Sequence, residues 1–415
     1  MNHPKMKYTY VGVDSHKDTH TAVFLDCFFE KIAETVVDNM PSEFGAFLSK
    51  AEKFKMEGTT LLFGLEDISA YGRMLAVFLK NNGQAVKHVN ALLVARERRN
   101  RNITEKTDSI DAECAARVLL SKFNELPDAQ PDDKYWVLRT LVVRRGFVVK
   151  NNISLKNHLH SLLTHHYPNY RSFFKEIDGP TSLAFFMWYP SPSTLDGVTA
   201  EELAELLGGP SNGKVGMKKA QEILDSLQDT AVPFQELRDD AVQSTIRQIQ
   251  FNLRELGRLE ETLETALSWF DTTLTTMAGI DTVSASQLLS CIGDIKRFPT
   301  PAKLAQYAGI APVHYSSGKK DRLFANKRGN RELNSLLFLL AGRLVMTFGS
   351  ANKVINPFFY EYYHRKMSEG KTKRQALKCV QRRIVNILWS MLTHGKEYIN
   401  PIPYNLPDEV KNQIK

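Results

Sequence analysis

The stretch VGVDSHKDTH, residues 11–20, decides the fold of the N-terminal third of the chain. The apolar run from Tyr8 to Val13 predicts a short β-strand that ends at Asp14. Thr21 to Leu25 predicts a second strand after the polar turn. Together they predict a β-hairpin whose first strand ends in a carboxylate.

Further strand and helix patterns alternate after this hairpin. Thr59 to Leu65 is an apolar run, and Ala85 to Val89 is a shorter one. Between them, Tyr71 to Lys80 has helical spacing, and the sequence from Asp108 to Phe123 also predicts a helix. Mixed hairpin and strand–helix units of this kind predict an α/β domain over residues 1–128.

The middle third, residues 129–270, is predicted to be helical. Leu138 to Leu163 and Ile246 to Phe270 repeat apolar residues at helical spacing, with charged residues between them. Two such helices predict a helical hairpin or coiled coil. Proline and glycine interrupt the segment around 170–240, which predicts an insertion of short helices.

The last third, residues 271–400, is predicted to be mostly helical and to end in a short tail at 401–415. Its centre is a basic loop with serine and glycine, YSSGKKDRLFANKRGN, from Tyr315 to Asn330. Leu333 to Phe348 and Lys373 to Leu392 have helical spacing after it. The predicted fold class of the whole chain is therefore α/β plus α.

The composition favours a globular protein with a basic surface. The 415 residues carry a formal net charge of +8 and a sequence pI near 9.1. This balance favours a polyanionic partner, although many basic proteins have none. Four scattered cysteines without zinc-type spacing predict reduced thiols and argue against a disulfide scaffold. The start has no signal-peptide pattern and no apolar run is long enough for a membrane span, so we expect a soluble cytoplasmic protein.

Four carboxylates of the predicted α/β domain stand where they could hold a metal. Asp14 and Glu66 each end a strand, and Asp108 and Asp111 lie three apart at a helix start, on one side of the helix. Oxygen donors that converge at one sheet edge would hold one or two Mg²⁺ ions beside a phosphodiester. Taken singly, each has a plainer interpretation: Asp14 as a turn or cap residue, Glu66 as a surface acid, Asp108 as a helix N-cap and Asp111 as a first-turn acid.

The order and context of these carboxylates resemble one protein family. VGVDSHKDTH (11–20), LEDISAYGRML (65–75), the segment 89–119 with its KTDSIDA, and LVVRRGFVVKNNISLKNHLHSLL (141–163) follow one another as in the DEDD-type insertion-sequence transposases. The most specific of these pieces is KTDSIDA. The resemblance implies an RNase H-like (RuvC-like) N-terminal domain and a bridge RNA that guides the protein.

The resemblance also assigns an acidic tetrad, which would be Asp14, Glu66, Asp108 and Asp111. One residue departs from the family pattern, because Asp67 stands where the family usually has a small or hydroxyl residue. Neighbouring residues of a strand point to opposite faces, and we keep Glu66 as the predicted ligand.

The C-terminal third resembles the same family over residues 277–344 and 356–392. In that family the serine before the loop glycine is the proposed nucleophile, which here is Ser317, with Ser316 as the alternative. A serine hydroxyl needs a base, a metal or nearby positive charge to act as a nucleophile. Five loop cations could supply that charge: Lys319, Lys320, Arg322, Lys327 and Arg328. Without the family context, such a loop is typical of a solvated surface.

Two further basic stretches predict contacts with nucleic-acid phosphates, which give affinity but not sequence choice. The first contains Arg96, Arg98, Arg99 and Arg101, and the second contains Lys371, Lys373 and Arg374. The alternative for any one of these residues is a place on a solvated helix face. The family's opening turn, Gly-Ile-Gly, is replaced by Gly279-Ile280-Asp281, which argues against a close phosphate contact there.

We therefore expect a transposase that cuts and rejoins DNA at the ends of an insertion sequence and at its target. The reaction would pass through a phosphoserine intermediate and use Mg²⁺ at the tetrad. The expected partners are DNA, a guide RNA and further copies of the chain in a dimer or tetramer. Two alternatives stay open: a RuvC-like two-metal nuclease or junction resolvase that uses water, and an inactive nucleic-acid-binding relic.

Overall fold

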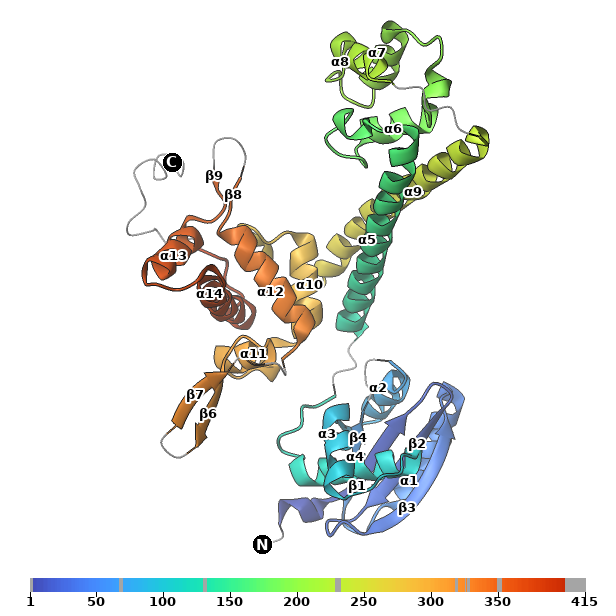
Figure 1. Ribbon diagram of the computed structural model, residues 1–415. Coiled ribbons are helices and arrows are strands. Elements are labelled where there is room, and N and C mark those ends of the chain that lie inside the picture. The colour runs from blue at the N-terminus through green and yellow to red at the C-terminus, as the bar shows by residue number, and fades with distance from the viewer. Residues whose placement is uncertain are drawn as a thin grey trace. The chain divides into compact units, whose positions relative to one another are not determined.

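The computed structural model describes residues 3–66, 70–129, 133–227, 233–317, 320–324, 326, 329–348 and 353–399, without the side chains at 133, 315, 317, 320–323, 348 and 353. The chain forms two compact units, Met1–Trp136 and Val137–Lys415. Figure 1 colours them along the chain from blue to red. Within the described ranges, no helix is both long and apolar enough to cross a membrane.

A five-stranded sheet forms the centre of the N-terminal unit. Its strands are β1 (Tyr8–Ser15), β2 (Thr19–Leu25), β3 (Lys31–Asp38), β4 (Thr60–Leu65) and β5 (Ala85–His88). They lie in the order β3-β2-β1-β4-β5, in which β1–β2 and β2–β3 are antiparallel and β1–β4 and β4–β5 are parallel. The four predicted strands are confirmed. The edge strand β3 was missed because most of its side chains are exposed, so it lacks an apolar run.

Helices cover both faces of this sheet, as Figure 1 shows. They are α1 (Pro41–Phe54), α2 (Arg73–Asn81), α3 (Ala91–Asn100) and α4 (Asp108–Lys122). Val11 and Val13 of β1 pack in one core with Phe44 of α1, whereas Tyr10 packs in another core with Ala115 of α4. This alternation follows from the period of two in a strand. The unit is an α/β domain with a mixed sheet, consistent with the expected RNase H-like fold.

Two glycines let α4 lie directly against the sheet. Gly12 of β1 and Gly64 of β4 are register partners in the parallel pair. A Cβ atom at Gly12 would lie 2.2 Å from the carbonyl oxygen of Ala112 and 2.2 Å from the nitrogen of Ala116, closer than real atoms approach. At Gly64 it would lie 3.1 Å from the side chain of Leu119. Because Gly12 has no side chain, the backbone of α4 can pack directly against β1.

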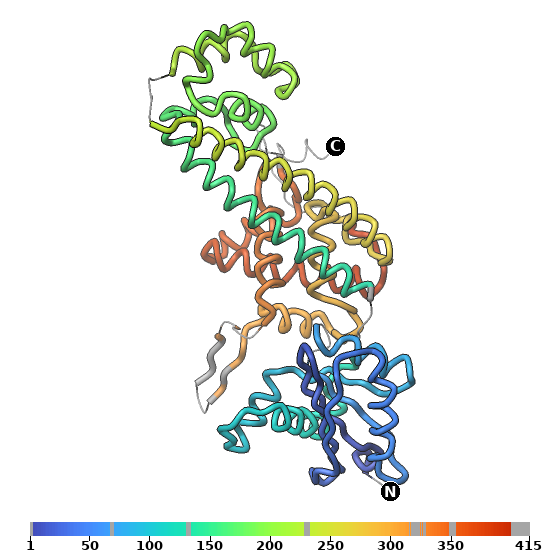
Figure 2. Tube along the Cα trace, turned by 90° about the vertical axis from the view of Figure 1, so that its right-hand side faces the viewer, coloured from blue at the N-terminus to red at the C-terminus, as the bar shows by residue number. Residues whose placement is uncertain are grey.

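Two long helices run side by side in the second unit (Figure 2). They are α5 (Asp133–His166) and α9 (Gln235–Leu267). Arg145 pairs with Glu260 at 2.6 Å, and Asn252 donates to Asn151 at 3.3 Å, so the helices are antiparallel. Both predicted helices are confirmed, and α9 starts well before the predicted Ile246. A 34-residue helix of this kind matches the expected helical hairpin.

Short helices pack together beside one end of this pair. They are α6 (Pro180–Trp188), α7 (Ala200–Gly208) and α8 (Met217–Asp225). Their core is rich in aromatic side chains, among them Tyr167, Phe173, Phe185 and Phe186, with ring centroids 5.0–6.4 Å apart. Contacts of this kind stabilise a small helical core. Single turns of 3-10 helix complete the chain: η1 (Pro4–Lys7), η2 (Tyr170–Ser172), η3 (Pro192–Leu195), η4 (Leu274–Thr276) and η5 (Ile295–Arg297).

The C-terminal part of the second unit is mostly helical. Its helices are α10 (Thr282–Ile292), α11 (Pro301–Tyr307), α12 (Arg331–Leu344), α13 (Pro357–Ser368) and α14 (Lys373–His394). Two hairpins interrupt them: β6 (Val313–Ser317) with β7 (Lys320–Phe324), and β8 (Thr347–Phe348) with β9 (Lys353–Val354). The helix predicted up to Phe348 therefore ends at Leu344, because Thr347 and Phe348 pair with β9 instead. Cys114 and Cys291 are buried, and all four cysteines are free, as predicted.

Candidate active site

The end of β1 places Asp14 on the face of the sheet that α4 covers. Tyr10 and Gly12 of β1 lie on that face, and the strand period of two makes Asp14 the next member of the row. Asp14 pairs in register with Thr21 of β2, and only 8% of it is exposed. The carboxylate of Asp14 is therefore nearly buried, and the pairing of β1 in the sheet fixes the position of its backbone.

The start of α4 brings Asp108 and Asp111 to the same place. Thr107 is the N-cap of this helix, because its side chain accepts a hydrogen bond from Ile110 N at 3.2 Å. The plainer interpretation of Asp108 as the N-cap is therefore wrong. Asp108 and Asp111 both lie in the first turn, where the helix dipole favours anions.

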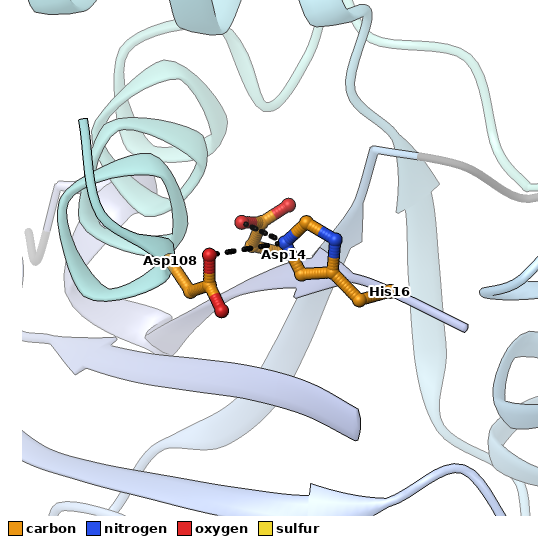
Figure 3. A group of neighbouring side chains, drawn as sticks. All are labelled: Asp14, His16 and Asp108. Atoms are coloured by element: carbon orange, nitrogen blue, oxygen red, sulfur yellow. Dashed lines mark hydrogen bonds and ion pairs between the residues drawn. The ribbon is translucent and has the colours of Figure 1, made fainter. Parts of the chain in front are cut away.

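His16 joins the two carboxylates, although sequence analysis did not single it out. Its Nε2 lies 3.1 Å from Oδ2 of Asp14 and 3.1 Å from Oδ1 of Asp108. Figure 3 shows the imidazole pointing between a residue of β1 and a residue of α4. The only hint in the sequence is that His16 follows Asp14 by two positions in the turn between the first two strands.

This group concentrates negative charge in a partly buried place. Burial raises the pKa of Asp14, the carboxylates of Asp111 and Asp108 raise it further, and His16 lowers it. Burial lowers the pKa of His16, but the carboxylates of Asp14 and Asp108 outweigh it, so the pKa of His16 is raised. The shift of Asp14 comes mainly from burial, whereas that of His16 comes from the neighbouring carboxylates, and both favour a bound cation at this place.

Asp111 has a different partner from the other acids. Its carboxylate forms an ion pair with Arg98 of α3, and these two side chains are 10% and 20% exposed. Its charge still acts on Asp14, as the pKa of Asp14 shows. Arg98, which we predicted to contact phosphates, is directed at an acid of the predicted tetrad in this structure.

Glu66 lies at the same edge of the sheet. Val13 of β1 is the register partner of Leu65 of β4, so Glu66 follows its strand beside the strand that ends at Asp14. Among the described residues, the donor atoms found within 4.8 Å of one another belong to Asp14, His16 and Asp108, and Glu66 is not in that group. Asp67, the departure from the family pattern, is outside the described residues.

The donor set fits a divalent metal. Carboxylate oxygens are the ligands that Mg²⁺ and Mn²⁺ take, and an imidazole nitrogen suits first-row transition metals. One oxygen each from Asp14 and Asp108 and one nitrogen from His16 lie close enough together to reach a single ion. Asp14, Asp108 and His16 are therefore the described residues whose donor atoms lie within reach of one ion, and the charge of Asp111 acts on the same place.

The predicted serine loop is largely a β-hairpin, which projects from its helices in Figure 1. Ser317 of β6 is the register partner of Lys320 of β7, and Ser316 is the partner of Asp321. Residues 313–317 and 320–324 pair antiparallel along their whole length. The side chains of Ser317, Lys320 and Arg322, and the whole of Lys319, Lys327 and Arg328, lie outside the described residues.

The base of this hairpin is fastened by close backbone contacts. A Cβ atom at Gly329 would lie 2.2 Å from the nitrogen of Gly309, so the chain segments before and after the hairpin touch. Asn330 N donates to Tyr307 O at 2.6 Å, and Asn334 Nδ2 donates to Ala308 O at 2.7 Å. The serine therefore stands on a hairpin that is anchored at its base.

The predicted basic residues of α3, and Arg101 at its C-cap, have two kinds of surroundings. Arg98 and Arg101 pair with acids of α4, and Arg101 lies 2.9 Å from Glu113. Arg96 and Arg99 are exposed. Among the described residues, the exposed pair has no carboxylate to leave before it can bind a phosphate, whereas Arg98 and Arg101 must first leave theirs.

The second predicted basic stretch lies at the turn into α14. Lys373 and Arg374 are exposed in the first turn of this helix, and Lys371 before it is half-buried. No acidic residue stands in that first turn. Cations at a helix N-terminus add to the positive end of the helix dipole, so this turn attracts anions.

The departure at Gly279-Ile280-Asp281 has a structural explanation. Asp281 is the N-cap of α10: its Oδ1 accepts a hydrogen bond from Ser284 N at 2.8 Å. Its Oδ2 lies 3.1 Å from Arg343 of α12. The aspartate thus ties two helices together where the family usually has a glycine.

Comparison with known proteins identifies the class of enzyme. A family model for DEDD-type IS110 transposases, described as a transposase, matches residues 11–168. A second, described as the transposase IS116/IS110/IS902 family, matches residues 271–363. The first range contains the four predicted acids, and the second contains Ser316 and Ser317. The chain is a DNA transposase.

Individual relatives narrow this class to a family. Over 404 residues the chain is 27% identical to an uncharacterized 43.6 kDa protein of insertion element IS110 from Streptomyces coelicolor, covering 95% of this chain and 96% of that one. A 44.8 kDa protein of insertion element IS116 from Streptomyces clavuligerus is 25% identical over 95% and 96% of the two chains. A pilin gene-inverting protein of Moraxella bovis is 31% identical over 30% of this chain and 37% of its own length. The chain belongs to the IS110/IS116 family of DEDD-type insertion-sequence transposases.

Proposed function

We propose that this transposase cuts and rejoins DNA through a phosphoserine on Ser317. A divalent metal, expected from the sequence to be Mg²⁺, would be bound by Asp14, Glu66, Asp108 and Asp111. The observation that carries the proposal is the meeting of Asp14 and Asp108 at the end of β1, with Asp111 beside them. The strand order of the sheet supports an RNase H-like fold for residues 1–128. The four acids then form one edge of that fold.

The chemistry is a pair of transesterifications. The hydroxyl oxygen of Ser317 attacks a phosphodiester, so that a phosphorus–serine bond forms and the bond to the departing sugar oxygen breaks. The departing oxygen gains a proton, and the serine proton passes to a base or to solvent. A new sugar hydroxyl then attacks the phosphoserine: a new phosphodiester bond forms, the bond from phosphorus to the serine oxygen breaks, the attacking hydroxyl loses its proton, and the serine oxygen regains one. A metal ion held by the acids of the N-terminal domain would neutralise charge on the phosphate.

The other parts of the chain take supporting roles in this proposal. Residues 129–270 form the helical coiled-coil segment, with the insertion around 170–240, and residues 271–400 form the serine transposase domain. The tail at 401–415 lies outside the described residues. The exposed Arg96 and Arg99 and the turn at Lys373 and Arg374 support contacts with phosphates.

Partners follow from the same proposal. The chain acts on element ends and target DNA, in the cytoplasm, with a guide RNA that reads the sequence and with further copies in a dimer or tetramer. Several strands must be cut together in recombination, which supports an oligomer. The guide is tested by expressing the protein with its flanking element and sequencing the RNA that co-purifies. A defined RNA from the flank supports the proposal, and random cellular RNA contradicts the guide.

One observation also favours a second candidate function, a RuvC-like nuclease or junction resolvase. The acids and His16 come together within the N-terminal unit alone, so a metal site there does not require the serine hairpin. Such an enzyme uses water as the nucleophile and leaves free DNA ends. The two functions differ in whether a protein–DNA bond forms.

The metal site is tested by four isosteric changes: Asp14→Asn, Glu66→Gln, Asp108→Asn and Asp111→Asn. Each removes an anionic ligand at nearly constant shape, so we expect recombination of a two-plasmid substrate to fall by about a hundredfold or more. Thermal unfolding should change little in the first three variants, whereas Asp111→Asn should also lower stability because it breaks the ion pair with Arg98. Asp18→Asn is the matched control, because Asp18 is exposed in the same turn region and should keep activity. Full activity in two of the four variants would contradict the tetrad.

A further inference from the structure

We infer that His16 is a direct nitrogen ligand of the metal, which makes this a mixed nitrogen and oxygen site that prefers Mn²⁺ over Mg²⁺. The inference rests on the proposed metal site and deepens it. It concerns a residue that lies outside the four predicted acids. Its starting point is that one imidazole nitrogen is equally distant from two carboxylate oxygens that come from different elements.

The distances match those between ligands of one ion. Adjacent corners of an octahedron with bonds of about 2.1 Å lie about 3.0 Å apart. Nε2 of His16 lies 3.1 Å from Oδ2 of Asp14 and 3.1 Å from Oδ1 of Asp108. The nitrogen therefore already stands at the spacing of a neighbouring ligand to both oxygens, and the three donor atoms lie within 4.8 Å of one another.

The backbone of His16 is held in place by the surrounding turn. His16 N donates to Thr19 O at 3.0 Å, which closes the turn between β1 and β2. The side chain of Asn39 donates to His16 O at 3.4 Å and to Lys17 O at 3.1 Å, and Asn39 N donates to Asp18 O at 2.8 Å. The turn is fastened on both sides, which fixes the backbone position from which the imidazole of His16 reaches the two acids.

Exposure and donor chemistry favour a metal that accepts nitrogen. The side chain of His16 is 49% exposed and that of Asp108 is 57% exposed, so an ion and its waters can reach the site. Mg²⁺ takes oxygen ligands almost exclusively, whereas imidazole suits first-row transition ions. A first-row transition ion such as Mn²⁺ gains more binding free energy from the nitrogen of His16 than Mg²⁺ does. We therefore expect the site to prefer Mn²⁺ over Mg²⁺.

The alternative is that His16 only hydrogen-bonds to the acids and leaves when a metal arrives. Pulsed electron paramagnetic resonance of Mn²⁺ bound to the full-length protein distinguishes the two. We expect the nitrogen coupling of a directly coordinated imidazole, and a change of that coupling when the histidines carry ¹⁵N. The coupling should vanish in His16→Asn and persist in His3→Asn, a matched change at an exposed histidine of the same unit.

Affinity gives a second, independent readout. His16→Ala should weaken Mn²⁺ binding by about tenfold and Mg²⁺ binding by much less, because only the nitrogen contribution is lost. The double variant Asp14→Asn with Asp108→Asn should remove the signal and so locate the ion. Bound Mn²⁺ without nitrogen coupling would overturn the role of His16 and leave the acidic site standing. Absence of Mn²⁺ binding by the wild-type protein would overturn both.

Discussion

The acidic site and the serine hairpin are built in opposite ways. Asp14 and Asp108 stand on a buried strand and a helix that touch backbone to backbone across Gly12, so the core of the domain sets their positions. The serine stands on a two-stranded hairpin whose base is fastened by close contacts at Gly309, Gly329 and Asn330. The acids are thus fixed by packing, whereas the serine is carried on an extension.

This difference suits the two proposed roles. A metal site needs donor atoms held within a few tenths of an ångström, and packed elements supply that precision. A nucleophile that must reach a DNA strand and later hand it on gains from standing on an element that projects from its unit. Changes in the packing that supports each place should therefore fail differently: at the acidic site they should destabilise the N-terminal unit, and at the base of the hairpin they should reduce recombination without affecting metal binding.

The largest effect is expected from Gly12→Ala. The added Cβ would stand 2.2 Å from two backbone atoms of α4, and a helix backbone cannot give way as a flexible side chain does. We expect thermal unfolding of the N-terminal unit to show a loss of about 3 kcal/mol or more, together with loss of metal binding. Gly45→Ala in α1 is the control, because nothing lies within 4 Å of its Cβ position, and it should be neutral or slightly stabilising.

Gly329→Ala should reduce recombination without affecting metal binding. Its Cβ would press on Gly309 and move the base of the hairpin, so recombination should fall by about tenfold or more. Mn²⁺ binding at the N-terminal unit should stay unchanged. Gly342→Ala in α12, which has open space at its Cβ, should keep activity. Equal loss of metal binding and recombination in Gly329→Ala would refute the division into two separately built sites.

The basic helix α3 offers a comparison within one element. Arg98→Ala leaves the carboxylate of Asp111 without its partner, so it should destabilise the unit by about 1–3 kcal/mol, less than for a fully buried pair because Arg98 is partly exposed. Arg99→Ala should leave stability unchanged and reduce the salt dependence of nucleic-acid binding by about one phosphate contact. Chemical denaturation and binding at several salt concentrations measure the two. The same salt slope in wild type and Arg99→Ala would show that Arg99 faces solvent only.

The smallest effect is expected at the cap of α10. Burial raises the pKa of Asp281, but hydrogen bonds from Ser284 and the charge of Arg343 outweigh it, so the net pKa is lowered. A lowered pKa in the folded state stabilises the protein above the ordinary aspartate pKa, and this contribution is lost as the pH falls through the folded value. Asp281→Ala should therefore cost about 1 kcal/mol at pH 7 and progressively less below about pH 4. A difference that does not change with pH would contradict the charge contribution.

Much of the N-terminal unit could be predicted because its strands have apolar runs and its acids follow strand ends and a helix start. The convergence of Asp14 and Asp108 on one place followed from that logic. The contacts of His16 and Arg98 could not be predicted in this way, because they depend on residues that are distant in the sequence. Asn39 holds the turn that carries His16, and Asp111 forms an ion pair with Arg98. The hairpin of Ser317 was also hidden, because its polar strands lack the alternation that predicts a half-buried sheet.

The central claim is that the serine hairpin forms the covalent bond to DNA, and its most direct test is to find that bond. Wild-type protein would be trapped on a nicked or modified target DNA, digested, and mapped by peptide mass spectrometry. We predict a phosphodiester remnant on Ser317, which disappears with all cleavage in Ser317→Ala and survives at least in part in Ser316→Ala. An adduct on Ser316 would move the nucleophile by one residue. Efficient cleavage by Ser317→Ala with free DNA ends would contradict the claim and leave a water-using RuvC-like nuclease.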